Sequence, residues 1–484
     1  MNYNIIGREK EISELEYLLG TDKSEFLAVY GRRRVGKSFL VDEVYKSAIA
    51  FRTVGVFIKS EELTEESYRQ KQLKHFYESL LDYGLPATTE RPTTWLEAFS
   101  LLKQLLRRKR AKRKVIFLDE LPWMAGPKSA DFIAELGFFW NNFAAVQRNI
   151  VLVVCGSATS WMLDNVIHEY GGLHGRLTSQ MHVRPFTLNE CERYYQKRQF
   201  HLSHYEMVLS YMALGGIPYY LDLLRRDRTL TENLDEFFFQ KTKAKQEFED
   251  VYVGLFNSKD NYVGIVRALG NQFYGMTRTE ISKAVGQKSG GGLTKMLENL
   301  EESDVIRTYT RYGGPQKETV YQLIDFFSLF YLRHIEKVVS VQKGWKSLQR
   351  SPQFFTWAGI TFELVAMMHQ RQLANALRLG TISACYSWKG TSTAGTGAQI
   401  DMVLEWKGER TDYLFEIKFS ESTYAIDADY EQNLRNKIDA FLHSKKHNPI
   451  HSINLVFLTT FGLSQGIHNA PIDTSLTMDV LFKE

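Results

Sequence analysis

Cysteine is scarce in this sequence, which has only Cys155, Cys191 and Cys385 among its 484 residues. The three are widely separated and form no pair with the spacing of metal ligands, so a cysteine-based metal module is not expected. Their small number and separation favour reduced thiols. We therefore expect a cytoplasmic protein.

Long apolar runs are missing as well. No stretch reaches the roughly 18 consecutive apolar residues that a membrane helix needs, and residues 1–8 lack the basic and then apolar pattern of a signal peptide. Internal repeats and low-complexity tracts are also absent. The sequence therefore predicts no membrane partner.

The sequence also lacks a large excess of charge of one sign. It has 60 Lys and Arg and 56 Asp and Glu, for a net charge of +4. No global electrostatic argument for a nucleic-acid partner follows. Only the segment 107–114 is strongly basic. It is either a solvated helix end or a contact for a phosphate backbone. The length predicts about three domains.

A phosphate-binding pattern is the most informative feature that the sequence does contain. Residues 31–38 fit G-x-x-x-x-G-K-[ST], directly after the apolar segment 26–30 and before an amphipathic segment. In such a strand–loop–helix context, backbone N–H groups surround the phosphates and the helix N-terminus adds its positive dipole. We expect Lys37 to reach the β- and γ-phosphates of ATP and Ser38 to ligate Mg²⁺.

Two further apolar segments end in polar residues that an ATPase needs. The segment 115–118 is followed by Asp119, which would hold Mg²⁺ through its water shell, and Glu120, which would polarise the attacking water. The segment 150–157 ends in Ser157. This serine, or Thr159 beyond it, either contacts the γ-phosphate or the lytic water, or is an ordinary turn residue.

Two arginines lie beside this expected nucleotide core. Arg176 belongs to a glycine-rich segment, where an arginine can stabilise transition-state charge in cis or across a subunit boundary. The alternative is an ordinary surface arginine. Arg8 stands ahead of an expected helix near the start of the chain, in an arm that could cover the adenine.

Together these segments resemble the archaeal-type ATPases of the AAA+/STAND group. The triple arginine at 32–34 and the Gly-Gly-Ile-Pro run at 215–218 make the likeness specific. The matching segments are 7–9, 30–38, 118–120, 155–157, 174–176 and 214–218. The resemblance implies an ATP-dependent switch or motor, and an ATPase domain through which the chain could form a homo-oligomer.

The resemblance also implies an α/β fold with a P-loop AAA+-like ATPase core, a helical lid, a winged-helix domain and a C-terminal restriction-endonuclease-like α/β domain. The expected ranges are 1–185, 186–260, 261–340 and 350–484 in that order. The residues expected to contact the nucleotide or its Mg²⁺ are Arg8, Gly31, Arg34, Val35, Gly36, Lys37, Ser38, Phe39 and Asp119.

The C-terminal third carries a second set of charged residues. Glu416 and Lys418 are two apart in an expected strand, which puts them on one face, and a hairpin would bring Asp401 beside them. Two carboxylates and a lysine can bind Mg²⁺ or Mn²⁺ and activate a water against a phosphodiester, with Lys418 orienting the water. This is the D…E-x-K pattern of PD-(D/E)XK nucleases. The alternative is an exposed Glu/Lys pair on a strand.

The order of expected elements around these residues fits the nuclease fold. A helix over 357–366 comes first and offers Glu363 as an additional metal ligand. Expected strands follow at 385–388, 399–406 and 413–419, then a helix near 430–443 and a strand over 453–458.

Between these parts, two expected helices and a hairpin over 277–323 predict a winged helix, whose second helix usually enters the major groove. That helix would expose Glu298, Glu301 and Glu302 with only Lys295 as a cation, which suits a phosphate-lined groove poorly. Either the wing makes the contact instead, or the module packs against the ATPase and relays its state. The wing cations are Arg307, Arg311 and Lys317.

Our leading hypothesis is a cytoplasmic ATPase whose nucleotide state controls a metal-dependent nuclease domain acting on DNA or RNA, with DNA favoured over RNA. The alternative is a nucleotide-gated regulatory or interaction switch whose nuclease fold binds nucleic acid without cleaving it. A translocating motor has no support, because the sequence shows no sign of a pore.

Overall fold

The computed structural model describes residues 3–484 except for 59–63, 127–129, 169–170, 240–242, 256–258, 313–317, 337–343, 381, 383, 407 and 409. The chain divides into two compact units, which we describe separately. The first contains the residues up to Pro185 with the segments 253–257 and 302–304, and the second contains the remainder. Within the described ranges, no helix is both long enough and apolar enough to cross a membrane.

The first unit is an α/β fold built on a parallel sheet. Its strands are β1 (Glu25–Tyr30), β2 (Ile49–Val54), β3 (Lys114–Asp119), β4 (Ile150–Gly156) and β5 (Ser179–His182). Its helices are α1 (Glu9–Gly20), α2 (Lys37–Tyr45), α3 (Glu65–Asp82), α4 (Trp95–Arg108), α5 (Leu121–Ala125), α6 (Ala130–Phe139) and α7 (Thr159–Met162). The strand order is β2-β3-β4-β1-β5, and every neighbouring pair is parallel.

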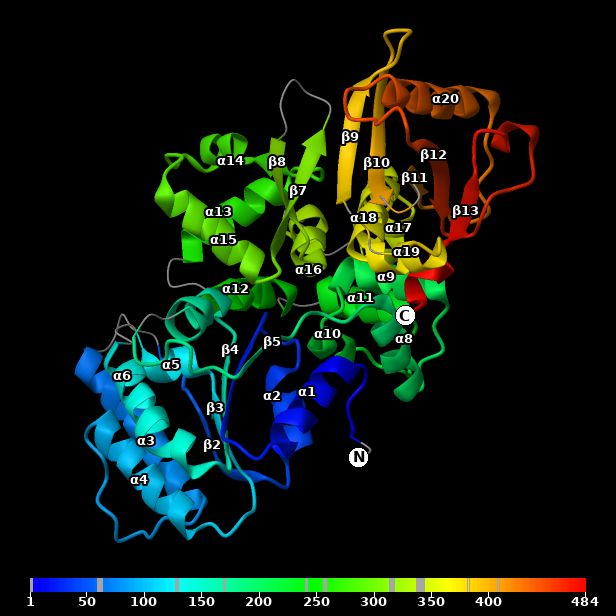
Figure 1. Cartoon of the computed structure of the whole chain (residues 1–484). Coiled ribbons are helices and arrows are strands. Elements are labelled where there is room, and N and C mark those ends of the chain that lie inside the picture. The colour runs from blue at the N-terminus through cyan, green and yellow to red at the C-terminus, as the bar shows by residue number, and fades with distance from the viewer. Residues whose placement is uncertain are drawn as a thin grey trace. The chain divides into compact units, whose positions relative to one another are not determined.

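Helices cover this sheet, with α1 and α2 to one side of the strands and α3, α4 and α6 to the other (Figure 1). Strands buried on both faces read as continuous apolar runs, and β4 is accordingly buried at every residue. Helix α4 begins at Thr94, whose hydroxyl accepts a hydrogen bond from the backbone of Glu97. The α/β class expected for this part of the chain is confirmed.

The basic segment after α4 is partly structural. The guanidinium group of Arg113 donates to the carbonyl oxygens of Leu18 (2.6 Å) and Lys23 (2.7 Å). The ammonium group of Lys114 donates to the carbonyl of Leu106 (2.9 Å). At these two positions the cations satisfy backbone carbonyls, so they are not available to a phosphate backbone.

The second unit begins with the helices α8 (Leu188–Lys197), α9 (His204–Leu214), α10 (Pro218–Asp222), α11 (Leu230–Phe238) and α12 (Lys243–Leu255). Helices α8, α9 and α11 each start with a capping box, in which a Ser or Thr and a Glu three residues later satisfy each other's backbone N–H groups. The expected lid is therefore helical where it is described.

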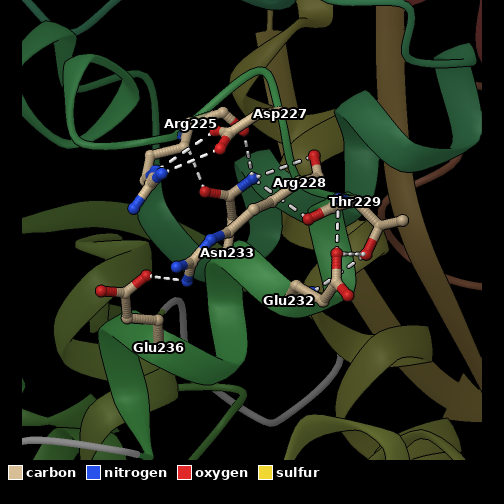
Figure 2. A network of polar contacts seen from close by, with 7 residues as sticks. All are labelled: Arg225, Asp227, Arg228, Thr229, Glu232, Asn233 and Glu236. Carbon is tan, nitrogen blue, oxygen red and sulfur yellow. Dashed lines mark hydrogen bonds and ion pairs between the residues drawn. The ribbon is translucent and has the colours of Figure 1, made fainter.

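A polar network fixes the turn before α11 (Figure 2). The amide oxygen of Asn233 accepts from the backbone N–H of Arg225 (2.7 Å), and its amide nitrogen donates to the carbonyl oxygens of Arg225 (2.9 Å) and Thr229 (3.0 Å). Arg225 pairs with Asp227 (2.8 Å), and Arg228 pairs with Glu236. The buried amide of Asn233 thus closes the turn between α10 and α11.

The middle of the second unit contains α13 (Lys259–Gly270), β6 (Met276–Thr277), α14 (Arg278–Val285), α15 (Gly291–Glu302), β7 (Ile306–Tyr312) and β8 (Glu318–Leu323). Helix α14 ends at Gly286, which has a φ of +67°, the left-handed conformation that favours glycine at a helix C-terminus. β7 and β8 are antiparallel, and β6 pairs with β8. The expected helices and hairpin are present, and their identification as a winged helix stays a prediction.

The C-terminal part contains α16 (Phe326–Phe330), α17 (Trp345–Gln349), α18 (Pro352–Met368), α19 (Gln370–Ala376), β9 (Ala384–Thr391), β10 (Gly397–Trp406), β11 (Thr411–Lys418), α20 (Ala428–Leu442), β12 (Ser452–Thr459) and β13 (Thr474–Thr477). β9, β10 and β11 are antiparallel neighbours, while β12 and β13 continue parallel to β11. The expected order of helix, three strands, helix and strand is therefore observed.

The sequence did not indicate that the hairpin and the C-terminal strands form one sheet. Its eight strands run in the order β13-β12-β11-β10-β9-β7-β8-β6. The junction is a parallel pairing of Arg311 with Ser387 and of Tyr312 with Trp388. The β7–β8 hairpin is therefore joined to its neighbours along β7.

Two expectations for this module were wrong. Of its three helix acids, only Glu298 is exposed, and Glu301 accepts hydrogen bonds from the backbone and hydroxyl of Thr308. Arg307 is not available to a phosphate either, because its guanidinium group donates to Gln322 (2.8 Å) and contacts Met367. Lys317 lies outside the described residues.

Candidate functional site

The phosphate-binding loop connects β1 to α2 as expected. Gly31 has a φ of +137°, and a Cβ there would lie 2.3 Å from the carbonyl oxygen of Val183. Gly36, which immediately precedes α2, has a φ of +89°. Both positions require glycine, the first for close approach and the second for its backbone conformation. Arg34 also adopts a positive φ, of +73°.

Lys37 lies inside the curve of this loop. Only 5% of the residue is exposed, and its ammonium group donates to the carbonyl oxygens of Gly31 (2.8 Å) and Arg32 (2.9 Å). Ser38 is half-buried and Phe39 is exposed. The lysine is thus held within the loop by backbone acceptors.

Arg8 ties the N-terminal segment to the loop. Its guanidinium group donates to the carbonyl oxygens of Val35 (3.3 Å) and Arg184 (2.6 Å), and it lies 3.6 Å from Glu11. Arg8 is therefore brought to the nucleotide loop, while its expected contact with the adenine stays a prediction.

The two acids after β3 point to different partners. Asp119 accepts from Arg52 (3.4 Å) and from the backbone of Glu120 (3.0 Å). Glu120 has a φ of +48°, and its carboxylate accepts from the hydroxyl (2.9 Å) and the backbone N–H (3.2 Å) of Ser157. Burial raises the pKa of Glu120, and the charge of Lys37 opposes this effect. The structure therefore brings Glu120 and Ser157 together.

Sequence reasoning missed Arg52 on β2. Its guanidinium group lies 2.8 Å from Asp42 on α2 and 3.4 Å from Asp119. The arginine thus connects the helix that follows the loop to the acid expected to hold Mg²⁺. A signal was present, because Arg52 is the only charged residue in the otherwise apolar strand.

Arg176 is exposed, in a turn where its backbone N–H donates to Leu173 (3.0 Å). Among the residues that the structure describes, no contact of its guanidinium group with the loop is seen. Its expected role in the transition state stays a prediction.

Residues 5–224 match the family described as an ATPase domain found predominantly in archaea. This part of the chain is an archaeal-type ATPase domain. The matched range contains the loop, both acids after β3 and Arg176. The match supports an ATPase, for which ATP is the nucleotide and Mg²⁺ the expected ion, while the contacts of the loop with them stay predictions.

The chain is also similar to several individual proteins. An uncharacterised protein of Methanocaldococcus jannaschii is 26% identical over 377 residues, which cover 75% of this chain and 76% of that protein. A Walker-type ATPase of Pyrococcus abyssi shares 19% identity at a TM-score of 0.49, over 68% of this chain and 96% of its own. The ORC2 protein of Aeropyrum pernix shares 14% identity at a TM-score of 0.42, over 68% and 95%.

A second group of charged residues is buried in the second unit, around Glu416 on β11. Glu416 is only 1% exposed, and its carboxylate lies 2.7 Å from the ammonium group of Lys418 and 2.6 Å from that of Lys437. The hydroxyl of Tyr430 donates to the same carboxylate. Burial acts to raise the pKa of Glu416, but the two lysines lower it overall.

Asp401 lies on β10, the antiparallel neighbour of β11, so the expected hairpin partner is present. Its carboxylate accepts a hydrogen bond from the backbone of Ile417 (3.1 Å). The register between β10 and β9 shifts between Ile400 and Val403, which makes Asp401 part of a β-bulge. Bulges commonly redirect a side chain beside a functional site.

Glu363 on α18 completes the group that we call the carboxylate cluster, which comprises Glu363, Asp401, Glu416, Lys418 and Lys437. Burial raises the pKa of Glu363 well above its ordinary value, and the charge of Asp401 raises it further. Burial and then the charge of Glu416 raise the pKa of Asp401. Two lysines and a third, partly exposed acid therefore surround the buried pair Asp401 and Glu416.

Three residues near this cluster were missed. Tyr430 and Lys437 lie four residues before and three residues after the buried Leu434 on α20, so helical spacing could have identified them. Tyr274 precedes β6, and burial raises its pKa, with Glu363 and Asp401 adding to the shift. No pattern in the sequence connects Tyr274 to the cluster.

The donors suit a hard cation, because Mg²⁺ and Mn²⁺ prefer carboxylate oxygens. Glu416, however, already accepts from two lysines and a tyrosine. Within the described part of the chain, no group of three or more His, Cys, Asp or Glu is arranged to hold a metal ion. A cation at Glu416 would therefore have to compete with Lys418 and Lys437.

Proposed function

We propose that this chain couples ATP hydrolysis in its archaeal-type ATPase domain to a phosphodiesterase site at the carboxylate cluster, which acts on DNA or RNA. The first half of the proposal assigns roles in the nucleotide loop. Lys37 contacts the β- and γ-phosphates, Ser38 and Asp119 hold Mg²⁺, and Glu120 orients the attacking water.

The contact of Glu120 with Ser157 supports this assignment, because it places the acid at the end of β4 beside a second polar group. A carboxylate that positions a water needs a fixed orientation, and Ser157 supplies a donor that fixes it. Arg176 is proposed as the arginine that stabilises the transition state, in cis or from a neighbouring subunit.

The second half of the proposal rests on one observation, which is that Asp401 and Glu416 are buried together beside three further charged side chains that are only partly exposed. Glu363, Asp401 and Glu416 come from three elements, and placing like charges in one buried region is costly. Clusters of this kind concentrate at functional sites. Asp401, Glu416 and Lys418 also follow the pattern of the PD-(D/E)XK nucleases, with Glu363 as an additional ligand for Mg²⁺ or Mn²⁺.

A second candidate is a nucleotide-gated switch whose C-terminal part binds nucleic acid without cleaving it. The pairing of Glu416 with both Lys418 and Lys437 favours this candidate, because it neutralises the acid that a metal would need. Under either candidate we propose that residues 261–340 form a winged helix. This module would pass conformational changes on to the C-terminal strands, since β7 is paired with β9.

Cleavage of labelled oligonucleotides by the full-length protein, with Mn²⁺ and with or without ATP, tests the proposal. Asp401→Asn and Glu416→Gln should abolish cleavage while ATP turnover stays at the wild-type rate. Lys418→Ala should retain Mn²⁺ binding and lose cleavage, because the lysine serves the water. DNA and RNA substrates are compared side by side.

Glu405→Gln is the matched control. Glu405 lies on the same strand as Asp401 and also pairs with a lysine, Lys446, but it is outside the cluster. Cleavage that survives in Asp401→Asn would place the active site elsewhere. A wild-type protein that binds the oligonucleotide and never cleaves it would leave the second candidate.

A further inference from the structure

A pocket of about 140 Å³ adjoins the carboxylate cluster. Helix α18 forms one wall. Its residues Glu363 and Met367, which are four apart and therefore on one face of the helix, both line the pocket. The joined sheet forms another wall, with residues from β7, β9 and β10. The residues that carry the argument are Tyr274, Tyr309, Arg311, Glu363, Lys389 and Asp401, all of which line the pocket.

The pocket wall exists because β7 and β9 are paired. Tyr309 and Arg311 are two apart on β7, so they share a face of the sheet. Arg311 is opposite Ser387, and Lys389, two residues further along β9, is opposite Gln399 on β10. Asp401 follows two residues later. One face of the joined sheet therefore carries cations from the hairpin side and an acid of the cluster.

The backbone that carries Tyr274 is fixed from three directions. Gly275 has a φ of +72°, and a Cβ there would lie 2.4 Å from the carbonyl oxygen of Tyr321. The amide of Gln322 donates to the carbonyl of Phe273 (2.8 Å). The hydroxyl of Tyr309 donates to the carbonyl of Tyr274 (2.7 Å). Tyr274 is nevertheless 43% exposed, so its backbone is held in place while the residue remains accessible.

We propose that this pocket guides one single strand of nucleic acid to the carboxylate cluster. Arg311 and Lys389 contact its phosphates, and Tyr274 stacks on one of its bases. The inference rests on the proposed phosphodiesterase site, and it adds the substrate class. Bases can stack on aromatic side chains only when they are splayed out of a duplex.

The size of the pocket favours a single strand over a duplex. Its volume of about 140 Å³ lies below the roughly 300–1,000 Å³ of pockets that enclose a drug-sized ligand. It therefore accommodates part of one nucleotide. The charges agree, since Arg311 and Lys389 attract phosphates, while Glu363 and Asp401, which also line the pocket, belong to the cluster.

Binding of a labelled single-stranded oligonucleotide, measured by anisotropy in EDTA over a range of salt concentrations, tests the inference without cleavage. Arg311→Ala and Lys389→Ala should each weaken binding and reduce the slope of log affinity against log salt by about 0.7, the value for one phosphate contact on a single strand. Tyr274→Ala should weaken binding about tenfold without changing that slope.

Lys445→Ala is the control, because Lys445 is an exposed lysine of the same unit outside the pocket. Thermal unfolding of every variant checks that the second unit, which carries all of these substitutions, is folded. Wild-type affinity and slope in Arg311→Ala and Lys389→Ala would overturn the inference. Equal or tighter binding of a duplex, lost in the same variants, would overturn the substrate class.

A cleavage assay with Mn²⁺ separates this inference from the proposed function. If the wild-type protein binds through the pocket and never cleaves, the phosphodiesterase proposal fails and the path for the strand stands. If all three pocket variants cleave as the wild type does, the path fails and the phosphodiesterase proposal stands.

Discussion

The nucleotide loop and the carboxylate cluster hold their charged side chains in different ways. In the loop, backbone groups do the holding, because Lys37 donates to the carbonyl oxygens of Gly31 and Arg32. In the cluster, charged side chains hold one another, and Glu416 lies within 2.7 Å of Lys418 and 2.6 Å of Lys437. The first arrangement depends on backbone conformation, whereas the second depends on charge.

This difference has consequences for experiment. A substitution in the loop that keeps the backbone removes one contact to the nucleotide. A substitution in the cluster leaves a buried partner with an uncompensated charge, which can cost 3–5 kcal/mol in typical proteins. Loop variants should therefore stay folded while they lose function, and cluster variants need isosteric replacements such as Glu416→Gln.

The largest effect is expected from Lys37→Ala, which should abolish ATP binding, because it removes the cation that lies within the curve of the loop. Titration with a fluorescent ATP analogue measures the affinity. Lys46→Ala is the control, since Lys46 is exposed at the other end of α2. Tight ATP binding by Lys37→Ala would show that the loop is not the site.

Arg176→Ala should reduce ATP turnover on the order of 10³-fold or more, with little change in ATP affinity, if the arginine acts on the transition state. Phosphate release under saturating ATP measures the effect. If Arg176 acts across a subunit boundary, mixing this variant with Lys37→Ala should restore some turnover. Wild-type turnover in Arg176→Ala would make it an ordinary surface arginine.

The loop could be predicted from sequence because the residues of its phosphate-binding pattern are consecutive in the chain. Residues 31–38 carry the phosphate-binding pattern and the start of α2 together, and the apolar strands before Asp119 and Ser157 mark the same edge of the sheet. The role of Arg52 was not predicted, although it is the single charged residue of β2. Its partners on α2 and β3 become neighbours only when the sheet forms.

The cluster could be predicted only in part. The spacing of Glu416 and Lys418 and the hairpin with Asp401 follow from strand alternation. The bulge that contains Asp401 does not, because it depends on the register between β10 and β9. The pairing of β7 with β9 is likewise a long-range contact that no local pattern encodes, and it is what brings Arg311 beside Lys389.

Glu120→Gln should keep ATP bound and slow hydrolysis by about 10²-fold or more, because the amide retains the shape of the side chain and loses the charge that orients water. Nucleotide affinity and single-turnover hydrolysis are measured on one preparation. Loss of ATP affinity as severe as that of Lys37→Ala would mean that Glu120 and not Asp119 supports the metal.

Acid should destabilise the second unit through His369. This ring accepts a hydrogen bond from the backbone of Leu188 (3.0 Å) and donates to the carbonyl of Val365 (2.8 Å), and burial lowers its pKa to about 4. The unfolded chain binds a proton near pH 6.5, so the stabilisation present above that pH is lost as pH falls from about 6.5 to 4. The difference amounts to about 3 kcal/mol.

Hydrogen exchange of the residues around α8 and the end of α18, compared between pH 7.5 and pH 5, measures this loss. His369→Gln should show a smaller difference between the two pH values, because glutamine cannot take up the proton. An unchanged pH difference in this variant would assign the acid sensitivity to other groups, such as His334, whose pKa burial also lowers to about 4.

The smallest effect is expected at His204, where pH acts in the opposite direction. The two ring nitrogens lie 2.6 Å from Asp479 and 3.0 Å from Glu192, and the ring stacks on Phe482. Burial acts to lower the pKa of His204, but the hydrogen bonds to Asp479 and Glu192 raise it overall. The protonated ring therefore stabilises the packing of residues 478–482 against α9.

This stabilisation is complete below about pH 6.5 and is lost as pH rises through the higher pKa of the folded state. Because the pair is partly solvated, the contribution should stay below about 1 kcal/mol and weaken with salt. Hydrogen exchange of residues 478–482 at pH 6 and pH 8 measures it, and His204→Asn should remove the difference. His443→Asn is the control, because His443 also faces an aspartate but is 60% exposed. A rise in protection of residues 478–482 from pH 6 to pH 8 would show that the charge of His204 does not stabilise this end of the second unit. Stabilisation by charged side chains, in contrast to the backbone contacts of the nucleotide loop, would then apply only to the carboxylate cluster.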